Sequence, residues 1–235
     1  MKRLLFILSA VLLSFYGCDK EDIANNGSES QNGSENGYQY IDLGLSVKWA
    51  TFNVGATKPE EYGNYYAWGE TEPKDNYSWS AYKWCDGSSR TLTKYNINSR
   101  YGIVDNKTAL DPEDDVAHVK WGGRWRMPTN EEQEELIDNC TWTWYRSGNT
   151  EFNGVAGYKV TSKIDGYTDR FIFLPAAGWR EETFLRGGSY GGVYWSGSLY
   201  TDRPNEVRSI GFDSDILGPG YYYRFYGQSV RPVCP

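Results

Sequence analysis

The chain has 235 residues, 31 acidic against 24 basic side chains, and a formal net charge of −7 at pH 7. A chain this acidic lacks the basic surface on which nucleic-acid binding depends, so no nucleic-acid partner is expected, and it does not have the charge of a polybasic membrane-surface binder. Aromatic residues make up 17% of the sequence and glycine occurs 26 times, whereas histidine occurs once. This composition predicts many short strands and turns rather than a helix bundle.

Residues 1–17 are predicted to be a lipoprotein signal peptide. Lys2 and Arg3 form its charged start, and the apolar stretch at residues 4–13 is too short to span a bilayer as a mature helix. Gly17 followed by Cys18 resembles a bacterial lipoprotein processing site, which predicts lipidation of Cys18. An ordinary cleaved signal with an incidental cysteine is the alternative.

Residues 18–37 are polar and low in complexity, and they show no apolar period. Such a segment cannot bury enough surface to fold, so we expect a disordered tether after the lipidated cysteine. The triplet at residues 20–22, Lys-Glu-Asp, resembles the surface-export signal of Bacteroidetes lipoproteins. The expected location is therefore the outer membrane, with the domain exposed on the cell surface.

The folded part is predicted to be a single domain at residues 38–235. Alternating or β-branched runs bounded by turn residues are typical of strands. They occur at residues 38–44, 47–54, 63–70, 156–163, 170–178, 193–200, 207–213, 221–227 and 228–233. Residues 71–118 are irregular and polar.

One helix is predicted, near residues 129–140. Thr129 followed by Glu132 makes a capping box, and acidic residues crowd the first turn, as the helix dipole favours. Leu136, Ile137 and Cys140 then fall on an inward-facing stripe. The carboxylates of this stretch are therefore explained by helix initiation, and we favour a scaffold role over a catalytic cluster.

Five segments carry a resemblance to a known family: YIDLGLSVKWATFNVGATKPEEYGNYYAWGE, GGRWRMPTNEEQEELI, FLPAAGWR, YWSGSL and YGQSVRPV. Together they resemble the Fibrobacter succinogenes major paralogous domain, which is found on surface lipoproteins of Bacteroidetes. The turn at residues 126–129 and the closing stretch at residues 227–231 also resemble the formylglycine-generating-enzyme branch of C-type-lectin-like folds.

This resemblance implies an α+β, C-type-lectin-like domain with twisted antiparallel sheets, one main helix and a ligand surface built from late, irregular loops. In such domains a helix cysteine often bridges to a late strand, which implies a disulfide between Cys140 and Cys234. The residues alone leave the pairing of these two cysteines and Cys85 open. The chemistry of the relatives does not carry over. One cysteine remains in the C-terminal part, and Arg203 stands where sugar-binding lectins place their first calcium ligand.

Other candidate chemistry is weak. His118 is the single histidine, which removes histidine triads and most acid–base schemes. The acidic stretch at residues 111–119 lacks the register of a calcium loop, so a solvated acidic turn is favoured, and residues 211–220 are interpreted in the same way. Residues 187–192, GGSYGG, are interpreted as a flexible loop rather than a nucleophile turn. No catalytic residue, metal site or cofactor is predicted.

Aromatic residues crowd the last 46 residues and alternate with arginine, aspartate and asparagine. Along a strand, Tyr222 points to the opposite face from Tyr221 and Tyr223, so all three cannot be core. Tyrosine, tryptophan and arginine are common binding anchors, and aromatic rings flanked by polar groups suit sugars. The predicted ligand-binding residues are Tyr190, Tyr194, Trp195, Tyr200, Asp202, Asn205, Arg208, Tyr221, Tyr222, Tyr223 and Arg224.

These observations predict a surface-anchored, non-enzymatic binding lipoprotein that recognises a glycan or a surface protein through its C-terminal aromatic loops. A narrower hypothesis is a receptor diversified by a retroelement, because residues 194–233 resemble the variable region of such systems. The alternatives are an enzyme acting on polysaccharide and a structural subunit of a cell-surface assembly. An enzyme of the first kind needs two carboxylates facing each other across a cleft.

Overall fold

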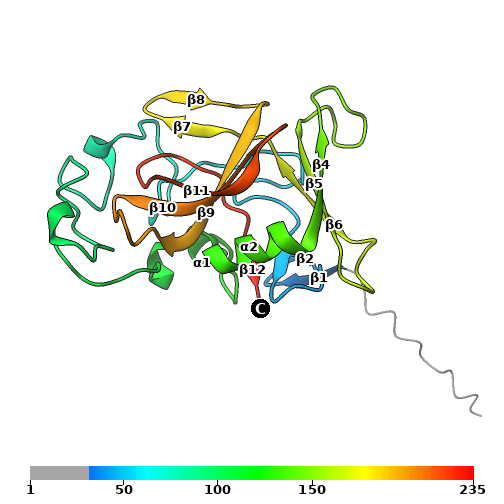
Figure 1. The fold of residues 1–235 in the computed structure, drawn as a ribbon, viewed down its shortest axis with the longest axis horizontal. Helices are drawn as coiled ribbons and strands as arrows, with labels where there is room; N and C mark the ends of the chain where they lie inside the picture. The colour runs from blue at the N-terminus through cyan, green and yellow to red at the C-terminus, as the bar shows by residue number, and fades with distance from the viewer. Residues whose placement is uncertain (1–31) are drawn as a thin grey trace, which may run out of the picture.

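Strands dominate residues 32–235, the part of the chain that the computed structural model describes (Figure 1). The strands are β1 (Asn32–Glu35), β2 (Tyr38–Ile41), β3 (Lys48–Ala50), β4 (Cys140–Tyr145), β5 (Gly157–Ser162), β6 (Phe171–Pro175), β7 (Trp179–Glu181), β8 (Phe184–Arg186), β9 (Gly191–Leu199), β10 (Glu206–Asp213), β11 (Leu217–Tyr223) and β12 (Val233–Cys234). They form antiparallel sheets with the orders β1-β2-β3-β12, β11-β10-β9, β4-β5-β6 and β7-β8.

Helices are few and short in this region. Two α-helices, α1 (Val116–Trp121) and α2 (Asn130–Asn139), accompany three single-turn 3-10 helices, η1 (Trp79–Ala81), η2 (Ser99–Tyr101) and η3 (Pro112–Asp114). The expectation of mostly antiparallel sheets with one main helix, of the α+β kind, is therefore confirmed. No helix among the described residues is long and apolar enough to cross a membrane.

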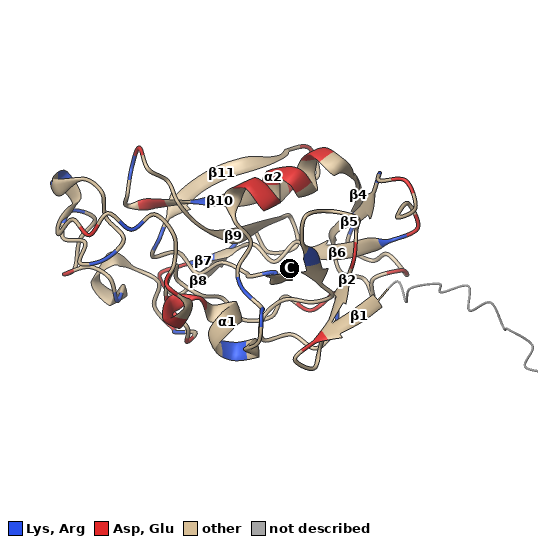
Figure 2. Cartoon of the chain, turned by 90° about the horizontal axis from the view of Figure 1, so that it is seen from below, with Lys and Arg blue, Asp and Glu red and all other residues tan. Residues whose placement is uncertain are grey.

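Helix α2 begins as its sequence predicts. The Thr129 hydroxyl accepts from the Glu132 amide at 3.2 Å, and the Glu132 carboxylate accepts from the Thr129 amide at 2.8 Å. Arg126 also donates to Glu132, at 2.7 Å, so this carboxylate is engaged in holding the turn. The capping box predicted at Thr129 and Glu132 is confirmed. Of the remaining acidic residues of the helix, which are red in Figure 2, three are exposed and Glu135 accepts from the Ser46 amide at 3.0 Å.

Strands β9 and β10 are covered on both faces over most of their length, whereas no residue of β11 is fully buried. On one face, α2 contacts the sheet, and Gln133 donates to the carbonyls of Tyr194 and Trp195 at 3.0 and 3.1 Å. Leu136 packs there in one core cluster with Ile210. On the other face, the cluster centres on aromatic residues that include Trp68, Tyr66 and Trp195. The two core clusters lie on opposite faces of the sheet. Because side chains alternate between the faces along a strand, neighbouring residues of a strand join different clusters.

The structure corrects the start of the domain and the middle of the chain. Residues 32–35, which we assigned to a disordered tether, form β1 and pair with β2, because Asn36 and Gly37 take the left-handed backbone of a tight turn. Cys18 and the signal peptide lie outside the described residues. Residues 63–70 and 224–232 form irregular segments joined by isolated bridges instead of regular strands.

The acidic stretch at residues 111–119 is also corrected, because it is not a solvated turn. Asp114 is 2% exposed and Asp115 is 7% exposed. Asp115 begins α1, and its carboxylate accepts from the amides of Ala117 and His118 at 2.9 and 3.1 Å and from Met127 at 2.8 Å. The His118 ring lies 3.3 Å from the Trp125 carbonyl, which is a structural role.

The implied disulfide is wrong. Cys140 and Cys234 are both buried and free, and they pack in different core clusters. Their strands belong to different sheets, because Cys140 begins β4 whereas Cys234 pairs with Lys48 of β3. Burial raises the pKa of the Cys140 thiol to about 12, so this side chain behaves as a neutral apolar group. Cys85 is also free and is half-buried.

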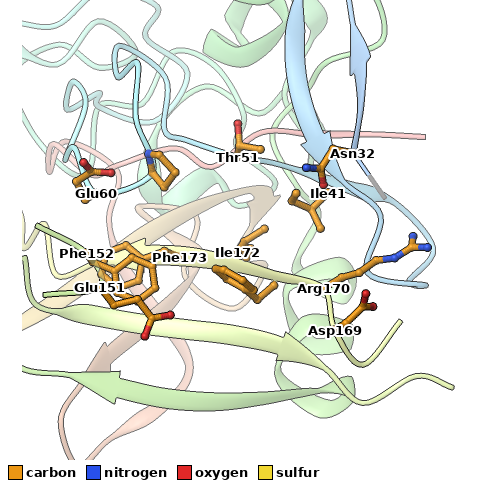
Figure 3. A pocket seen from close by; sticks show the side chains of 12 residues that line it. Asn32, Ile41, Thr51, Glu60, Glu151, Phe152, Asp169, Arg170, Ile172 and Phe173 are labelled. Atoms are coloured by element: carbon orange, nitrogen blue, oxygen red, sulfur yellow. The ribbon is translucent and has the colours of Figure 1, made fainter. Parts of the chain in front are cut away.

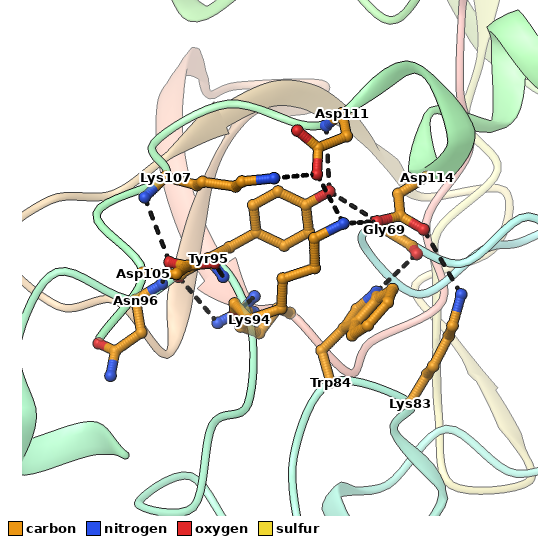
Figure 4. A network of polar contacts seen from close by, with 11 residues as sticks. Gly69, Lys83, Trp84, Lys94, Tyr95, Asn96, Asp105, Lys107, Asp111 and Asp114 are labelled. Carbon is orange, nitrogen blue, oxygen red and sulfur yellow. Dashed lines mark hydrogen bonds and ion pairs between the residues drawn. The ribbon is translucent and has the colours of Figure 1, made fainter. Parts of the chain in front are cut away.

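The irregular segment before α1 is held by a buried polar network (Figure 4). Tyr95 is fully buried with a φ of 59°, a left-handed backbone that is rare for a bulky residue. Its hydroxyl donates to Asp114 at 2.6 Å, and Lys94 pairs with both Asp111 and Asp114 at 2.6 Å. The Asp105 carboxylate accepts from the Tyr95 amide at 2.8 Å. This strained residue is therefore held at its side chain and at its backbone.

We expect Asp105→Asn to destabilise the protein by about 1–2 kcal/mol near neutral pH, and less in acid. Burial acts to raise the pKa of Asp105, but bonds from the amides of Asn96, Tyr95 and Lys107 lower it below its ordinary value. Because the folded pKa lies below the unfolded one, this stabilisation is full above the unfolded pKa and is lost as the pH falls through the folded pKa.

Urea unfolding of both proteins at neutral and at acidic pH measures this difference. Asp86→Asn, at an exposed carboxylate, is the control and should change stability little at either pH. A difference between native protein and Asp105→Asn that stays constant with pH would contradict this account of the Asp105 contacts.

Candidate functional site

One face of the β9–β10–β11 sheet forms the floor of a groove. Gly211 on β10 pairs with Gly218 on β11, so both lie on the same face. Residues two apart along a strand also share a face, which adds Gly220 and Tyr222. Three of these four residues have no side chain. The floor of the groove therefore carries one side chain, that of Tyr222, and a ligand can approach the backbone where this ring does not cover it.

The glycines of the floor have different roles. A Cβ atom at Gly211 would lie 2.8 Å from the Tyr222 hydroxyl, and one at Gly220 would lie 2.9 Å from the Tyr222 ring, so these two make room for that side chain. A Cβ atom at Gly218 would meet nothing within 4 Å, and its φ lies outside the left-handed range. Gly218 therefore leaves open space that no neighbouring side chain uses.

The walls of the groove come from outside the strands of the floor. Trp179 on β7 stands against Gly187, where an added Cβ atom would lie 2.9 Å from its ring. The β7–β8 hairpin is held beside the sheet by a bond from the Gly178 amide to the Gly191 carbonyl at 2.8 Å. Tyr190 and Ile216 complete the walls, and the groove has a volume of about 360 Å³.

Few polar groups face this groove. The Asp213 carboxylate accepts from the amides of Asp215 and Ile216, each at 2.8 Å, through one oxygen. Burial raises the pKa of the Tyr222 hydroxyl, which is therefore a neutral donor and acceptor at physiological pH. Tyr190 is 80% exposed and Ile216 is 68% exposed, so the mouth is apolar and open. The arrangement suits a ligand with a flat apolar face and a few hydroxyl or amide groups.

The predicted site residues do not form one surface. Tyr190 and Tyr222 line the groove. On the opposite face of the sheet, the rings of Tyr200 and Tyr221 stack with centroids 4.7 Å apart, and Arg208 lies 4.5 Å from the Tyr200 ring. Arg203 covers the Tyr221 ring at 4.4 Å, and the exposed Asp202 bonds the Tyr200 hydroxyl. This second cluster is an exposed aromatic–arginine patch behind the groove.

Tyr223 and Asn205 lie apart from both surfaces. Tyr223 is 39% exposed, and its ring packs against Trp79 and Phe225 at 5.9 and 5.8 Å. Asn205 is half-buried, and its backbone carbonyl accepts from the Arg224 amide at 3.3 Å. The prediction that at least one face of β11 exposes its tyrosines is confirmed, and the exposed face is that of Tyr221 and Tyr223. A role for Tyr223 or Asn205 in binding stays a prediction.

Three predicted ligand-binding residues are core residues, which corrects that assignment. Tyr194 is 1% exposed and donates to the Pro175 carbonyl at 2.8 Å, and Trp195 is fully buried and donates to the Tyr66 carbonyl at 2.7 Å. Arg224 is fully buried among aromatic rings and backbone carbonyls. Each polar tip is satisfied inside the protein, so none of these side chains is available to a ligand.

Sequence reasoning missed Trp179, Asp213 and Ile216 as members of the groove. The signal for the floor was present in the sequence LGPGYYY, where two glycines at a spacing of two precede Tyr222 on the same strand face. No comparable signal places Trp179, because its contact with the sheet depends on the path of the β7–β8 hairpin. The strands of that hairpin were not predicted, because residues 179–186 lie between the predicted strands at residues 170–178 and 193–200.

Comparisons of the chain with models of protein families, with curated proteins and with solved structures give no match. The functional assignment therefore follows from the geometry of the groove and from the composition of its walls. Those features are an open backbone floor, aromatic walls and a single carboxylate among the residues that line it.

Proposed function

We propose that this chain is a non-enzymatic binding protein that holds a glycan or a protein ligand in the groove over Gly218. The observation that supports this best is the open space over Gly218, flanked by Trp179 and Tyr190. Glycine weakens a strand, because it adds no packing and loses more entropy on folding. Tyr222 accounts for Gly211 and Gly220, and Gly218 is accounted for when the open space over it has a use.

The chemistry of the walls suits a sugar ring or a short peptide loop. An apolar ring face stacks on Trp179 or Tyr190, while hydroxyl groups donate to the free oxygen of Asp213 and exchange hydrogen bonds with Tyr222. Tryptophan and tyrosine give a large contact area with little loss of side-chain freedom. The aromatic–arginine patch behind the groove is a second exposed surface whose residue types suit a protein partner.

The two rival functions fit the groove less well. A glycoside hydrolase that uses the two-carboxylate mechanism needs a facing pair of carboxylates about 5–10 Å apart, and Asp213 is the one acid that lines the groove. A purely structural subunit would bury its exposed apolar groups against a fixed partner. Copurification of this chain with a partner protein in a constant ratio would favour the structural-subunit function.

The proposal includes the wider setting inferred from the sequence. The domain would be of the C-type-lectin-like kind and would belong to the Fibrobacter major paralogous lipoproteins. It would be anchored to the outer membrane through Cys18 and face the outside of the cell. Diversification of the C-terminal loops by a retroelement is a narrower form of the same proposal. The exposed rings of Tyr221 and Tyr223, on the face of β11 opposite the groove, support it as positions that tolerate change.

Gly218→Trp is expected to abolish binding while leaving the fold intact. The new ring enters space that no neighbouring atom occupies, so it fills the groove without displacing the core. Binding to a glycan array and to intact bacterial and host cells should fall at least about tenfold, with an unfolding midpoint within a few degrees of the native value.

Thr143→Trp is the matched control, because it adds the same ring to an exposed position on β4, outside the groove. It should bind like the native protein. Equal binding by a folded Gly218→Trp variant would exclude the groove as the site and would turn attention to the aromatic–arginine patch.

A further inference from the structure

A second cavity lies on another side of the molecule, along β6, between the β4–β5–β6 sheet and the strands β1 and β2 (Figure 3). Its volume is about 380 Å³. The consecutive residues 169–173 all line it. Side chains of consecutive strand residues point to opposite faces, so a cavity that touches all of them runs along the edge of the strand rather than over one face.

β6 is the edge strand of its sheet, and its outer backbone groups face this cavity. Arg170 bonds to Ser162 of β5 and Ala176 bonds to Ala156, so even-numbered residues of β6 point their backbone groups toward β5. Phe171 and Phe173 therefore point theirs away from β5. The Phe173 carbonyl accepts from Arg231 at 2.9 Å.

Two backbone donors and one backbone acceptor on this edge have no hydrogen-bond partner among the described residues. Within residues 32–235, neither the amide nor the carbonyl of Phe171 is bonded to another group, and the same is true of the Phe173 amide. Phe173 is 1% exposed, so its amide is a buried donor without a protein partner. Buried amides without a partner are rare in folded proteins and indicate that a ligand or an ordered water completes them.

The side chains around this edge are apolar in the middle and acidic at one end. Ile41 and Ile172 line the centre, and Glu60 and Glu151 stand near Phe152 at one end (Figure 3). Glu151 already pairs with Lys159 at 2.7 Å. The Glu60 carboxylate accepts a hydrogen bond from the side-chain amide of Asn153 and forms no ion pair with any described residue. The cavity therefore complements an apolar segment with a positive charge at one end.

We propose that this cavity is a binding site for an extended peptide of a partner protein, which adds a strand to the free edge of β6. The amide and carbonyl of Phe171 and the amide of Phe173 would pair with the main chain of the peptide. Alternate peptide side chains would enter the apolar centre, and a lysine or arginine would meet Glu60. Main-chain pairing supplies affinity in this mode, and the flanking pockets supply specificity. This site is separate from the groove over Gly218.

A random heptapeptide phage-display library selected on the immobilised full chain tests the proposal. Phe171→Pro serves in a counter-selection, because proline removes the outward amide and is tolerated at the first residue of an edge strand. Phe171→Leu is the matched control, since it also removes the ring but keeps the amide. We expect enriched peptides that alternate apolar residues with at least one basic residue. They should bind Phe171→Pro at least about fivefold more weakly than Phe171→Leu.

Two further variants separate the parts of the inference. Glu60→Gln should weaken binding of the enriched basic peptides, and Gly218→Trp should leave it unchanged because the groove lies elsewhere. Amide NMR resonances of Phe171 and Phe173 should shift on addition of an enriched peptide. A selection that yields no peptide preferring Phe171→Leu over Phe171→Pro would show that water alone completes the edge and would overturn the proposal. Enriched peptides without basic residues would overturn the role of Glu60.

Discussion

Arg231→Met is expected to lower the free energy of unfolding by about 4 kcal/mol or more. Arg231 is 1% exposed, and its guanidinium donates to the Asn53 side chain at 2.8 Å and to the carbonyls of Ala50, Thr51 and Phe173 at 2.9–3.1 Å. None of these acceptors is a carboxylate. Burial lowers the pKa of this guanidinium to about 10, so it stays charged at neutral pH and is stabilised by the dipoles around it.

The loss would be large because methionine leaves three buried acceptors, and the part-buried Thr51 carbonyl, without the donor that Arg231 supplies. Each unpaired buried acceptor costs about 1–3 kcal/mol, and local relaxation recovers part of this sum. Arg231 also joins the segment after β3 to β6, so its removal loosens two sheets at once. For a domain of this size, the unfolding midpoint should fall by roughly 10 °C or more.

Chemical and thermal unfolding of Arg231→Met and Arg100→Met measures this effect. Arg100 is exposed, so its replacement removes the same charge without unpairing a buried group. Arg100→Met should change the midpoint by about a degree or two. If both variants unfolded at the same temperature, the guanidinium contacts of Arg231 would contribute nothing beyond its net charge.

Arg224→Met is expected to lower the free energy of unfolding by about 3 kcal/mol. The segments that Arg224 contacts should loosen before the whole domain unfolds. The Arg224 side chain donates to the Tyr82 hydroxyl at 3.0 Å and to the carbonyls of Lys94, Tyr95 and Pro204 at 2.9–3.3 Å. These partners lie in the irregular segment at residues 82–95 and in the turn before β10. The guanidinium thus replaces the regular strand pairing that these segments lack.

Amide hydrogen exchange distinguishes local from global loosening in this variant. Residues 82–105 should lose protection in Arg224→Met, while the β4–β5–β6 sheet keeps it. Arg90→Met, at an exposed arginine of the same irregular segment, should leave both regions protected. A uniform loss of protection across all sheets would show that Arg224 supports the global fold instead of this segment.

The sequence predicted the features that depend on neighbouring residues. The capping box at Thr129 and Glu132 is closed within four residues, so its pattern predicts the helix directly. The split of Tyr221 and Tyr223 from Tyr222 follows from the two-residue period of a strand. The antiparallel strands at residues 157–162, 171–175, 191–199 and 206–213 were located for the same reason.

The sequence did not determine which strand face is covered or which polar tips are satisfied inside. Tyr194, Trp195 and Arg224 have the composition of binding anchors, but their partners lie about 20 to 130 residues away in the chain. The predicted disulfide is wrong for a related reason, because the order of the strands places Cys140 and Cys234 in separate core clusters.

The groove depends on the tertiary structure in the same way. Alternation places Gly218 and Tyr222 on one face of β11, whichever way the domain folds. That Trp179 stands beside this face, and that nothing fills the space at Gly218, is decided by the path of the β7–β8 hairpin. Burial is a sum of contacts from segments far apart in the chain, whereas strand and helix periodicity is a property of adjacent residues. The sequence therefore determined α2, several of the strands and the alternation of their faces, and the tertiary structure decided which faces a ligand can reach.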